Sequence, residues 1–177
     1  MVLVSQCVVT EPSSFEEAVE EPAWVDAMIE EYDSIVRNSA WEIVPRPVGK
    51  SVVGSRWIYK VKQAADESVE KYKARFFARG FSQIEGIDYE ETFSPVARYS
   101  SIWTILALSA QMGWHIHQMD VKTAFLNGVI EEEVYIEQPK GFEIFSRESH
   151  VCRLKRALYG LKQEPCAWYT WIDIYFT

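Results

Sequence analysis

Asp120 is the residue whose position most suggests chemistry. It closes an apolar-rich run over 114–119 that alternates like a strand, and a turn is expected directly after it. A carboxylate at a strand end beside a cleft is a common ligand for a hard divalent cation. Alone this signal is weak, because an aspartate that caps a turn is the more common case. His115 and His117 share one face of the same run, and we favour ordinary strand positions for them over a metal pair.

Charged residues are segregated along the chain. The net charge is −8, yet residues 11–33 hold nine acidic and no basic residues, whereas residues 46–80 hold nine basic residues against three acidic ones. A second basic cluster lies within residues 153–162. Such segregation can leave faces that accept phosphate groups in spite of an acidic total. Two ordinary solvated faces explain the same pattern equally well.

The elements that must position these residues are helices and short strands. Residues 80–98 contain Gly80, Gly86 and Pro95 without a sustained period, so they are expected to form a loop. In chain order we expect helix over 13–38, strands over 41–45, 52–62 and 71–79, that loop, helix over 100–112, a strand over 114–120, a helical turn over 123–126, strands over 133–137 and 151–154, and a helix from Pro165.

Three of these elements, a helix and two strands, carry clear patterns. Ser13 and Ser14 each precede a glutamate by three residues, which is typical of a helix start. The helix then repeats apolar residues at three-to-four spacing, at Trp24, Ala27, Met28, Tyr32, Ile35 and Val36. The strands over 52–62 and 71–79 flank a polar turn and predict an antiparallel hairpin with a basic side, on which Lys73 and Arg75 share a face.

Composition limits the class of protein. The 177 residues are 48% hydrophobic, enough for one domain with a real core or for part of a larger one. Cys7, Cys152 and Cys166 are far apart, so neither a disulfide framework nor a zinc ribbon is indicated and a reducing intracellular setting fits best. The start lacks the pattern of a secretory signal, and the longest apolar stretch, 102–112, is too short to span a bilayer.

Several blocks of the sequence resemble the reverse transcriptase of copia-type retrotransposons. They occur in the family's order and near its spacing, and they cover roughly residues 11–177. The blocks are Lys71-Tyr72-Lys73-Ala74-Arg75 with Ala78-Arg79-Gly80-Phe81, Gly86-Ile87-Asp88-Tyr89 through Thr92-Phe93-Ser94-Pro95-Val96, Gln118-Met119-Asp120-Val121-Lys122-Thr123-Ala124-Phe125-Leu126-Asn127-Gly128, Glu133-Val134-Tyr135-Ile136-Glu137-Gln138-Pro139, and Ala157-Leu158-Tyr159-Gly160-Leu161-Lys162-Gln163 with Ala167-Trp168-Tyr169.

The resemblance implies an α+β right-hand polymerase. Residues 13–177 would form the fingers and the first part of the palm, an incomplete antiparallel sheet with packed helices, and residues 1–12 a linker remnant. In the family, RNA-directed DNA polymerase extends a primer on an RNA or DNA template with deoxynucleoside triphosphates and Mg²⁺ or Mn²⁺. The intact element acts in the cytoplasm or in virus-like particles, and no membrane partner is expected.

The same resemblance suggests roles for individual residues. Asp120 would be the first metal-binding carboxylate, with the backbone at Val121 as a second oxygen donor. Phe125 would lie under the incoming sugar, where an aromatic ring leaves no room for a 2′ hydroxyl. Without the motif, Phe125 could equally be an ordinary core residue.

The other residues that the resemblance marks would contact the nucleotide. Lys73 and Arg75 would meet its triphosphate, although which one matches which family cation stays open. A further segment would line the nucleotide and template pocket, and its members are Tyr159, Gly160 and Lys162. Solvated strand positions for the two cations, and relief of a bend by Gly160, are the alternatives.

The family's second catalytic motif, Tyr or Phe-x-Asp-Asp, does not occur in these 177 residues. We therefore expect two of three metal-binding carboxylates to be lacking, metal binding to be weak or absent, an apolar helix face to be uncovered, and the chain to be inactive alone. A non-catalytic nucleic-acid-binding remnant and a decayed product without function are the alternatives. Salt-dependent binding to a primer–template duplex would separate these two.

Overall fold

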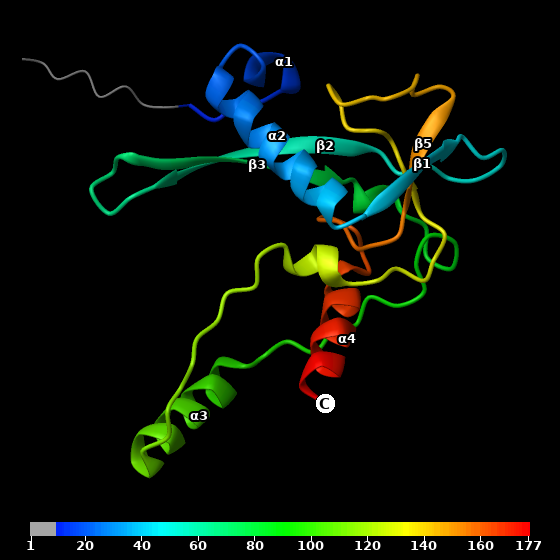
Figure 1. Cartoon of the computed structure of the whole chain (residues 1–177). Helices are drawn as coiled ribbons and strands as arrows, with labels where there is room; N and C mark the ends of the chain where they lie inside the picture. Colours follow the sequence, from blue (N-terminus) through cyan, green and yellow to red (C-terminus); the bar gives the residue numbers. More distant parts are fainter. Residues whose placement is uncertain (1–9) are drawn as a thin grey trace, which may run out of the picture.

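Two small antiparallel sheets and a set of helices make up the computed structural model, which describes residues 10–177 (Figure 1). This mixture agrees with the expected α+β class. Cys7 and most of the expected linker lie in residues 1–9, outside the described residues. The elements are α1 (Phe15–Ala18), α2 (Pro22–Arg37), β1 (Trp41–Pro45), β2 (Ser55–Gln63), β3 (Val69–Ala78), the 3₁₀ turn η1 (Gly80–Ser82), α3 (Tyr99–Met112), the 3₁₀ turn η2 (Ala124–Asn127), β4 (Tyr135–Ile136), β5 (His150–Leu154) and α4 (Glu164–Phe176).

The helix expected over 13–38 is divided into α1 and α2. Ser14 caps α1 by accepting a hydrogen bond from the backbone N–H of Glu17, as the serine–glutamate spacing indicated. Pro22 then occupies the start of α2, where its missing N–H costs no helical hydrogen bond. The apolar stripe of α2 packs on the β2–β3 hairpin and forms one of two hydrophobic clusters, with Trp24, Ala27, Met28, Tyr59 and Ala74 buried in it.

The predicted hairpin is confirmed. β2 and β3 pair antiparallel, with Trp57 opposite Phe76 and Lys60 opposite Lys73. Because side chains alternate along a strand, one face carries the residues that pack on α2, and the other carries most of the cations. The members of this second face are Arg56, Ile58, Lys60 and Lys62 from β2 and Lys71, Lys73, Arg75 and Phe77 from β3.

The second sheet has the order β1-β5-β4, all antiparallel. The strand expected over 151–154 is β5, whereas the one expected over 133–137 is only two residues long. Behind this sheet lies the larger hydrophobic cluster, which includes Ile35, Phe76, Ile136, Leu154 and Leu158. Since Phe76 belongs to the hairpin and Ile35 to α2, this cluster joins both sheets and the helix into one core.

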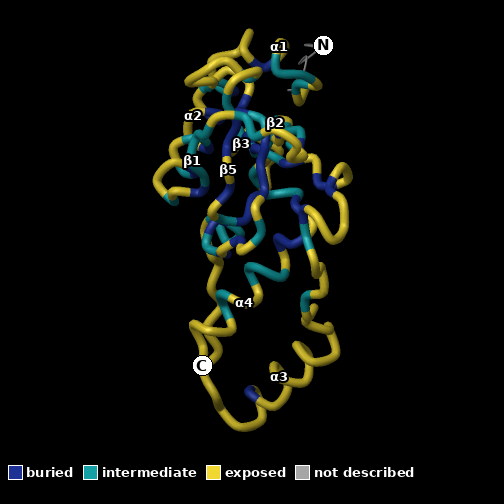
Figure 2. Tube along the Cα trace, turned by 90° about the vertical axis from the view of Figure 1, so that its right-hand side faces the viewer, coloured by how far each residue is buried: buried dark blue, intermediate teal, exposed yellow. Residues whose placement is uncertain are grey.

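The strand predicted over 114–120 is wrong. Helix α3 forms where residues 100–112 predicted it and ends at Gly113 in the left-handed conformation, but residues 114–120 have no regular structure. An alternating pattern forms a strand only beside a partner, and no strand of the described residues pairs with this segment. Both views show α3 apart from the body, and Figure 2 shows it almost wholly exposed. An uncovered apolar helix face was expected from the sequence, and the apolar residues of α3 are exposed in this way.

We expect Ile105→Lys to raise the solubility of the chain without changing its thermal unfolding. Ile105 is 60% exposed on α3, and its neighbours Trp103 and Leu108 are exposed too, so they form an apolar surface prone to association. Light scattering against concentration measures the first effect, and circular dichroism on heating measures the second. Ile35→Lys is the matched control, because Ile35 is fully buried and a charge there must unfold the core. Unchanged scattering for Ile105→Lys would contradict the prediction.

The C-terminal helix is present as predicted, and η2 packs against it. The backbone of Gly128 approaches so closely that a Cβ there would lie 2.8 Å from the carbonyl carbon of Ala167. Trp168, Trp171 and Tyr175 stack in series along one face of α4, and Tyr175 is exposed, so this face is only partly covered. Within residues 10–177, each helix is too short or too polar to cross a lipid bilayer.

Candidate functional site

Three side chains, one from η2 and two from β3, meet at Tyr159. The ring of Phe125, from η2, stands perpendicular to it with centroids 5.0 Å apart, and the ring of Phe77, from β3, stacks on it at 5.4 Å. The guanidinium carbon of Arg75, also from β3, lies 5.9 Å from the centre of the tyrosine ring. The structure therefore brings together Arg75, Phe125 and Tyr159, which the resemblance marks for nucleotide contact, and adds Phe77.

The segment that carries Tyr159 is bound to the end of the hairpin by its backbone. The N–H of Ala78 donates to the carbonyl oxygen of Tyr159 at 2.8 Å. Gly160 has a φ of +90°, and a Cβ on it would overlap the carbonyl oxygen of Ala78, while a Cβ on Gly80 would overlap the carbonyl of Gly160. Glycine is therefore required at both positions for the two backbone segments to approach each other.

Glu164 stabilises the same turn from the start of α4. Its Oε2 accepts a hydrogen bond from the N–H of Gly160 at 2.5 Å, and its side chain is 9% exposed. Burial raises the pKa of this carboxyl to about 7, although the hydrogen bond from Gly160 acts in the opposite direction. The turn that presents Tyr159 is thus held by a group that titrates near neutral pH.

Polar contacts between Gln83 and the same segment complete the connection. Gln83 donates from Nε2 to Oε1 of Gln163 at 3.0 Å and accepts from the N–H of Lys162 at 2.8 Å. Gln163 in turn donates to the carbonyl oxygen of Asp88. The backbone of Lys162 thus has a structural contact here, while its side chain is exposed, and its contact with a nucleotide stays a prediction.

Arg75 is held by an acid from α2 that the sequence did not single out. Its Nη1 donates to Oε2 of Glu31 at 2.8 Å and to the carbonyl oxygen of Ala74 at 3.0 Å. Glu31 is only 5% exposed, and burial raises the pKa of its carboxyl while the charge of Arg75 lowers it. The signal was present in the sequence, because residue 31 falls in the apolar stripe at the spacing of Trp24, Met28 and Ile35.

The acidic and basic segments of the sequence face each other in the fold. Acids from residues 11–31 pair with cations of the hairpin and of the loop after β4, in the pairs Glu11–Lys60, Glu16–Lys140, Glu30–Lys71 and Glu31–Arg75. Among the cations of residues 46–80, those without an ion pair to the described residues are Arg56, Lys73 and Arg79. The acidic and basic segments are therefore paired with each other in the fold, while binding of phosphate groups by the remaining cations stays a prediction.

Asp120 and Val121 lie in the exposed connection between α3 and η2. No group of three or more histidine, cysteine, aspartate or glutamate side chains in residues 10–177 is arranged to hold a metal ion. The residues that this part of the chain provides therefore do not fit a two-metal site. Cys152 and Cys166 are free cysteines, and His115 and His117 are exposed in the same connection as Asp120.

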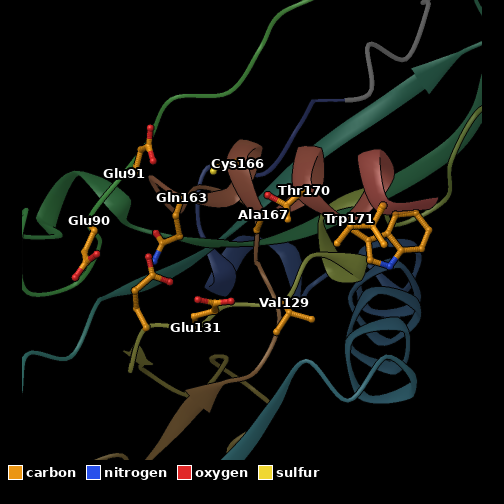
Figure 3. A pocket seen from close by; sticks show the side chains of 11 residues that line it. Glu90, Glu91, Val129, Glu131, Gln163, Cys166, Ala167, Thr170 and Trp171 are labelled. Carbon is orange, nitrogen blue, oxygen red and sulfur yellow. The ribbon is translucent and has the colours of Figure 1, made fainter. Parts of the chain in front are cut away.

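A cavity of about 620 Å³ opens beside α4 and is distinct from the Tyr159 cluster. Figure 3 shows Glu90, Glu91 and Glu131 around it, together with Cys166 and Trp171. Glu132 also lines it, and no basic residue does. Four carboxylates and no cation make this cavity unsuitable for a triphosphate.

Comparison with known proteins identifies the family. Residues 38–177 match the family described as Reverse transcriptase (RNA-dependent DNA polymerase). The chain is 44% identical over 166 residues to the retrovirus-related Pol polyprotein from transposon TNT 1-94 of Nicotiana tabacum, a match that covers 92% of this chain and 12% of that protein. It is 42% identical over 167 residues to the corresponding polyprotein from transposon RE2 of Arabidopsis thaliana, over 94% of this chain and 12% of that protein.

A shorter protein is also similar. An uncharacterised mitochondrial protein of Arabidopsis thaliana is 40% identical over 125 residues, which are 70% of this chain and 73% of that protein. No solved structure matches. The chain belongs to the reverse transcriptase family of copia-type retrotransposon Pol polyproteins, and it spans about an eighth of the length of the first two relatives.

Proposed function

We propose that these residues form the nucleotide-binding part of a retrotransposon RNA-directed DNA polymerase. This part comprises the fingers and the first part of the palm. The observation that carries the proposal is the cluster at Tyr159. Arg75, Phe125 and Tyr159 come from three family blocks that are far apart in sequence, and they converge on one place in the fold. A cation beside aromatic rings suits a nucleotide, which offers a triphosphate and an apolar sugar face.

The partners follow from this assignment. Lys73 and Arg75 would contact the triphosphate of a deoxynucleotide, and Tyr159 and Phe125 its sugar and base. Tyr159, Gly160 and Lys162 would border the template side. The complete polymerase would act on a template–primer duplex in the cytoplasm or in virus-like particles. Lys73 supports the triphosphate role because, within the described residues, no acid neutralises it.

These residues would provide only part of the metal-binding site that polymerisation needs. Asp120 and the backbone of Val121 would hold one Mg²⁺ or Mn²⁺, whose chemistry in this family is to align and neutralise the reacting phosphate groups. One carboxylate in an exposed connection leaves such an ion mostly hydrated, so weak binding is expected. We therefore infer that a polypeptide of these 177 residues recognises nucleotides without polymerising them.

The nucleotide proposal predicts selection against the 2′ hydroxyl. We expect the chain to bind dATP at least about 10-fold more tightly than ATP, because the ring of Phe125 excludes the extra oxygen. Phe125→Ala should bring the two dissociation constants together, measured by titration calorimetry with Mg²⁺ present. Phe81→Ala is the matched control, since Phe81 is exposed and outside the Tyr159 cluster. Equal affinity of the unmodified chain for both nucleotides would contradict this role of Phe125.

Primer extension tests the absence of polymerisation. We expect no incorporation of deoxynucleotides onto an annealed primer–template by the 177-residue chain, with either Mg²⁺ or Mn²⁺. Electrostatic stabilisation of the transferred phosphoryl group supplies nearly all of this catalysis, and a single carboxylate cannot provide it. Asp120→Asn identifies contamination, because a contaminating polymerase is unaffected by it. Incorporation that disappears in Asp120→Asn would show that the chain polymerises after all.

A further inference from the structure

Glu31 and Glu30 are adjacent acids on α2 that bind two cations of β3 in different ways. Glu30 pairs with Lys71 at 2.7 Å, and both side chains are largely exposed, at 61% and 47%. Glu31 pairs with Arg75 at 2.8 Å and is almost fully buried. A surface pair such as Glu30–Lys71 adds little to stability, whereas a buried carboxylate must be compensated by its partner. The exposed pair Glu30–Lys71 can therefore serve as the control for the buried pair Glu31–Arg75.

The contacts of Arg75 divide its donors between the protein and the solvent. Nη1 carries two hydrogens, and these serve Oε2 of Glu31 and the carbonyl oxygen of Ala74. Nε and Nη2 make no hydrogen bond to the described residues. These two nitrogens form one edge of the planar guanidinium, which is the geometry that binds two oxygens of a phosphate at once.

We infer that Glu31 is a positioning residue, which orients the guanidinium of Arg75 so that its free edge meets the triphosphate of a bound nucleotide beside Tyr159. This inference rests on the proposed function. Glu31 takes Nη1, and Tyr159 lies at 5.9 Å from the guanidinium carbon, so the plane of the group is restrained from two sides. An arginine restrained in this way loses less conformational entropy when it binds its ligand.

An argument from charge alone predicts that removing Glu31 strengthens triphosphate binding, whereas the positioning role predicts that it weakens binding. This difference makes the inference testable. Glu31 and Glu30 are both negative and close to the cations of β3, so removing either charge should attract a triphosphate more strongly if only electrostatics matters. If Glu31 positions Arg75, its removal must weaken binding in spite of the gain in positive charge. Glu30→Gln is the matched control for Glu31→Gln, with the same change of charge one residue away.

The experiment is titration of the 177-residue chain with dATP and Mg²⁺ at fixed salt. We expect Glu31→Gln to weaken binding about 10-fold, the effect of losing one well-placed charged hydrogen bond, and Glu30→Gln to leave it unchanged or slightly tighter. In an Arg75→Ala background, Glu31→Gln should have no further effect, because Glu31 acts through Arg75. Binding by Glu31→Gln as tight as by Glu30→Gln overturns the inference, and so does an equal loss in the Arg75→Ala background.

Arg75→Lys covers the case in which Glu31→Gln fails to fold. Lysine keeps the charge opposite Glu31 but lacks the two-nitrogen edge, so we expect a similar loss of about 10-fold, with Lys71→Arg as the control. Unchanged binding by Arg75→Lys overturns the inference. Absence of dATP binding by the unmodified chain is a different result, which overturns the proposed function and with it the role of Glu31.

Discussion

Gly160→Ala is expected to destabilise the chain by about 3 kcal/mol or more, enough to unfold most of it. Gly160 has a φ of +90°, and an added Cβ would overlap the carbonyl oxygen of Ala78, which is backbone and cannot rotate away. Relief would require the hairpin and the Tyr159 segment to separate, with loss of the hydrogen bond from Ala78 to Tyr159. Urea unfolding followed by circular dichroism measures the change.

Gly86→Ala is the control for this prediction. Gly86 also has a positive φ, of +79°, but an added Cβ there would meet no atom within 4 Å, so only the backbone cost of about 1 kcal/mol applies. The difference between the two variants isolates the close approach of the two backbones. If both variants lost the same free energy of unfolding, the contact between Gly160 and Ala78 would contribute nothing.

Glu164→Gln is expected to stabilise the chain at pH 8 and to leave it unchanged at pH 5. The pKa of Glu164 is raised from 4.5 to about 7 in the folded state. A raised folded pKa means that the protonated carboxyl stabilises the fold fully below pH 4.5 and that this stabilisation is lost as the pH rises through about 7. The loss can reach about 3–4 kcal/mol, because each pKa unit corresponds to about 1.4 kcal/mol, and glutamine, which stays neutral, does not undergo it.

The measurement is the free energy of unfolding in urea at pH 5 and pH 8. Burial also raises the pKa of Glu31, so some loss of stability toward pH 8 should persist in Glu164→Gln. Glu20→Gln is the control, because Glu20 is exposed and has no ion pair in the described part of the chain. If Glu164→Gln kept the full pH dependence of the unmodified chain, the raised pKa of Glu164 would not be its cause.

Local patterns predicted most of the elements. The stripe of α2, the cap of α1 and the alternation of β2 and β3 depend on residues close in sequence, and the structure confirms them. Residues 114–120 show the limit of this reasoning. Their alternation of Trp114, Ile116 and polar residues is typical of a strand, but pairing depends on a partner that the alternating segment does not itself encode.

The candidate site was predicted in part. Motif resemblance marked Arg75, Phe125 and Tyr159, and the fold brings these three together, while their roles toward a nucleotide stay predictions. Glu31 was missed because an acid on an apolar helix face is visible in the sequence, but its partner 44 residues away is not. The pairing of the acidic helices with the basic hairpin was missed for the same reason, since charge counts carry no information about distance in space.

The family match begins at residue 38, but α2 ends at Arg37 and supplies Trp24, Ala27 and Met28 to a core that the hairpin completes with Tyr59 and Ala74. A polypeptide that begins at residue 38 would therefore lack α2, and the hairpin side chains that pack on α2, Tyr59 and Ala74, would be exposed to water. It would also delete Glu31 and release Arg75. The cooperative folding unit thus includes the first helices, and truncated variants should retain them even though the family match begins after them.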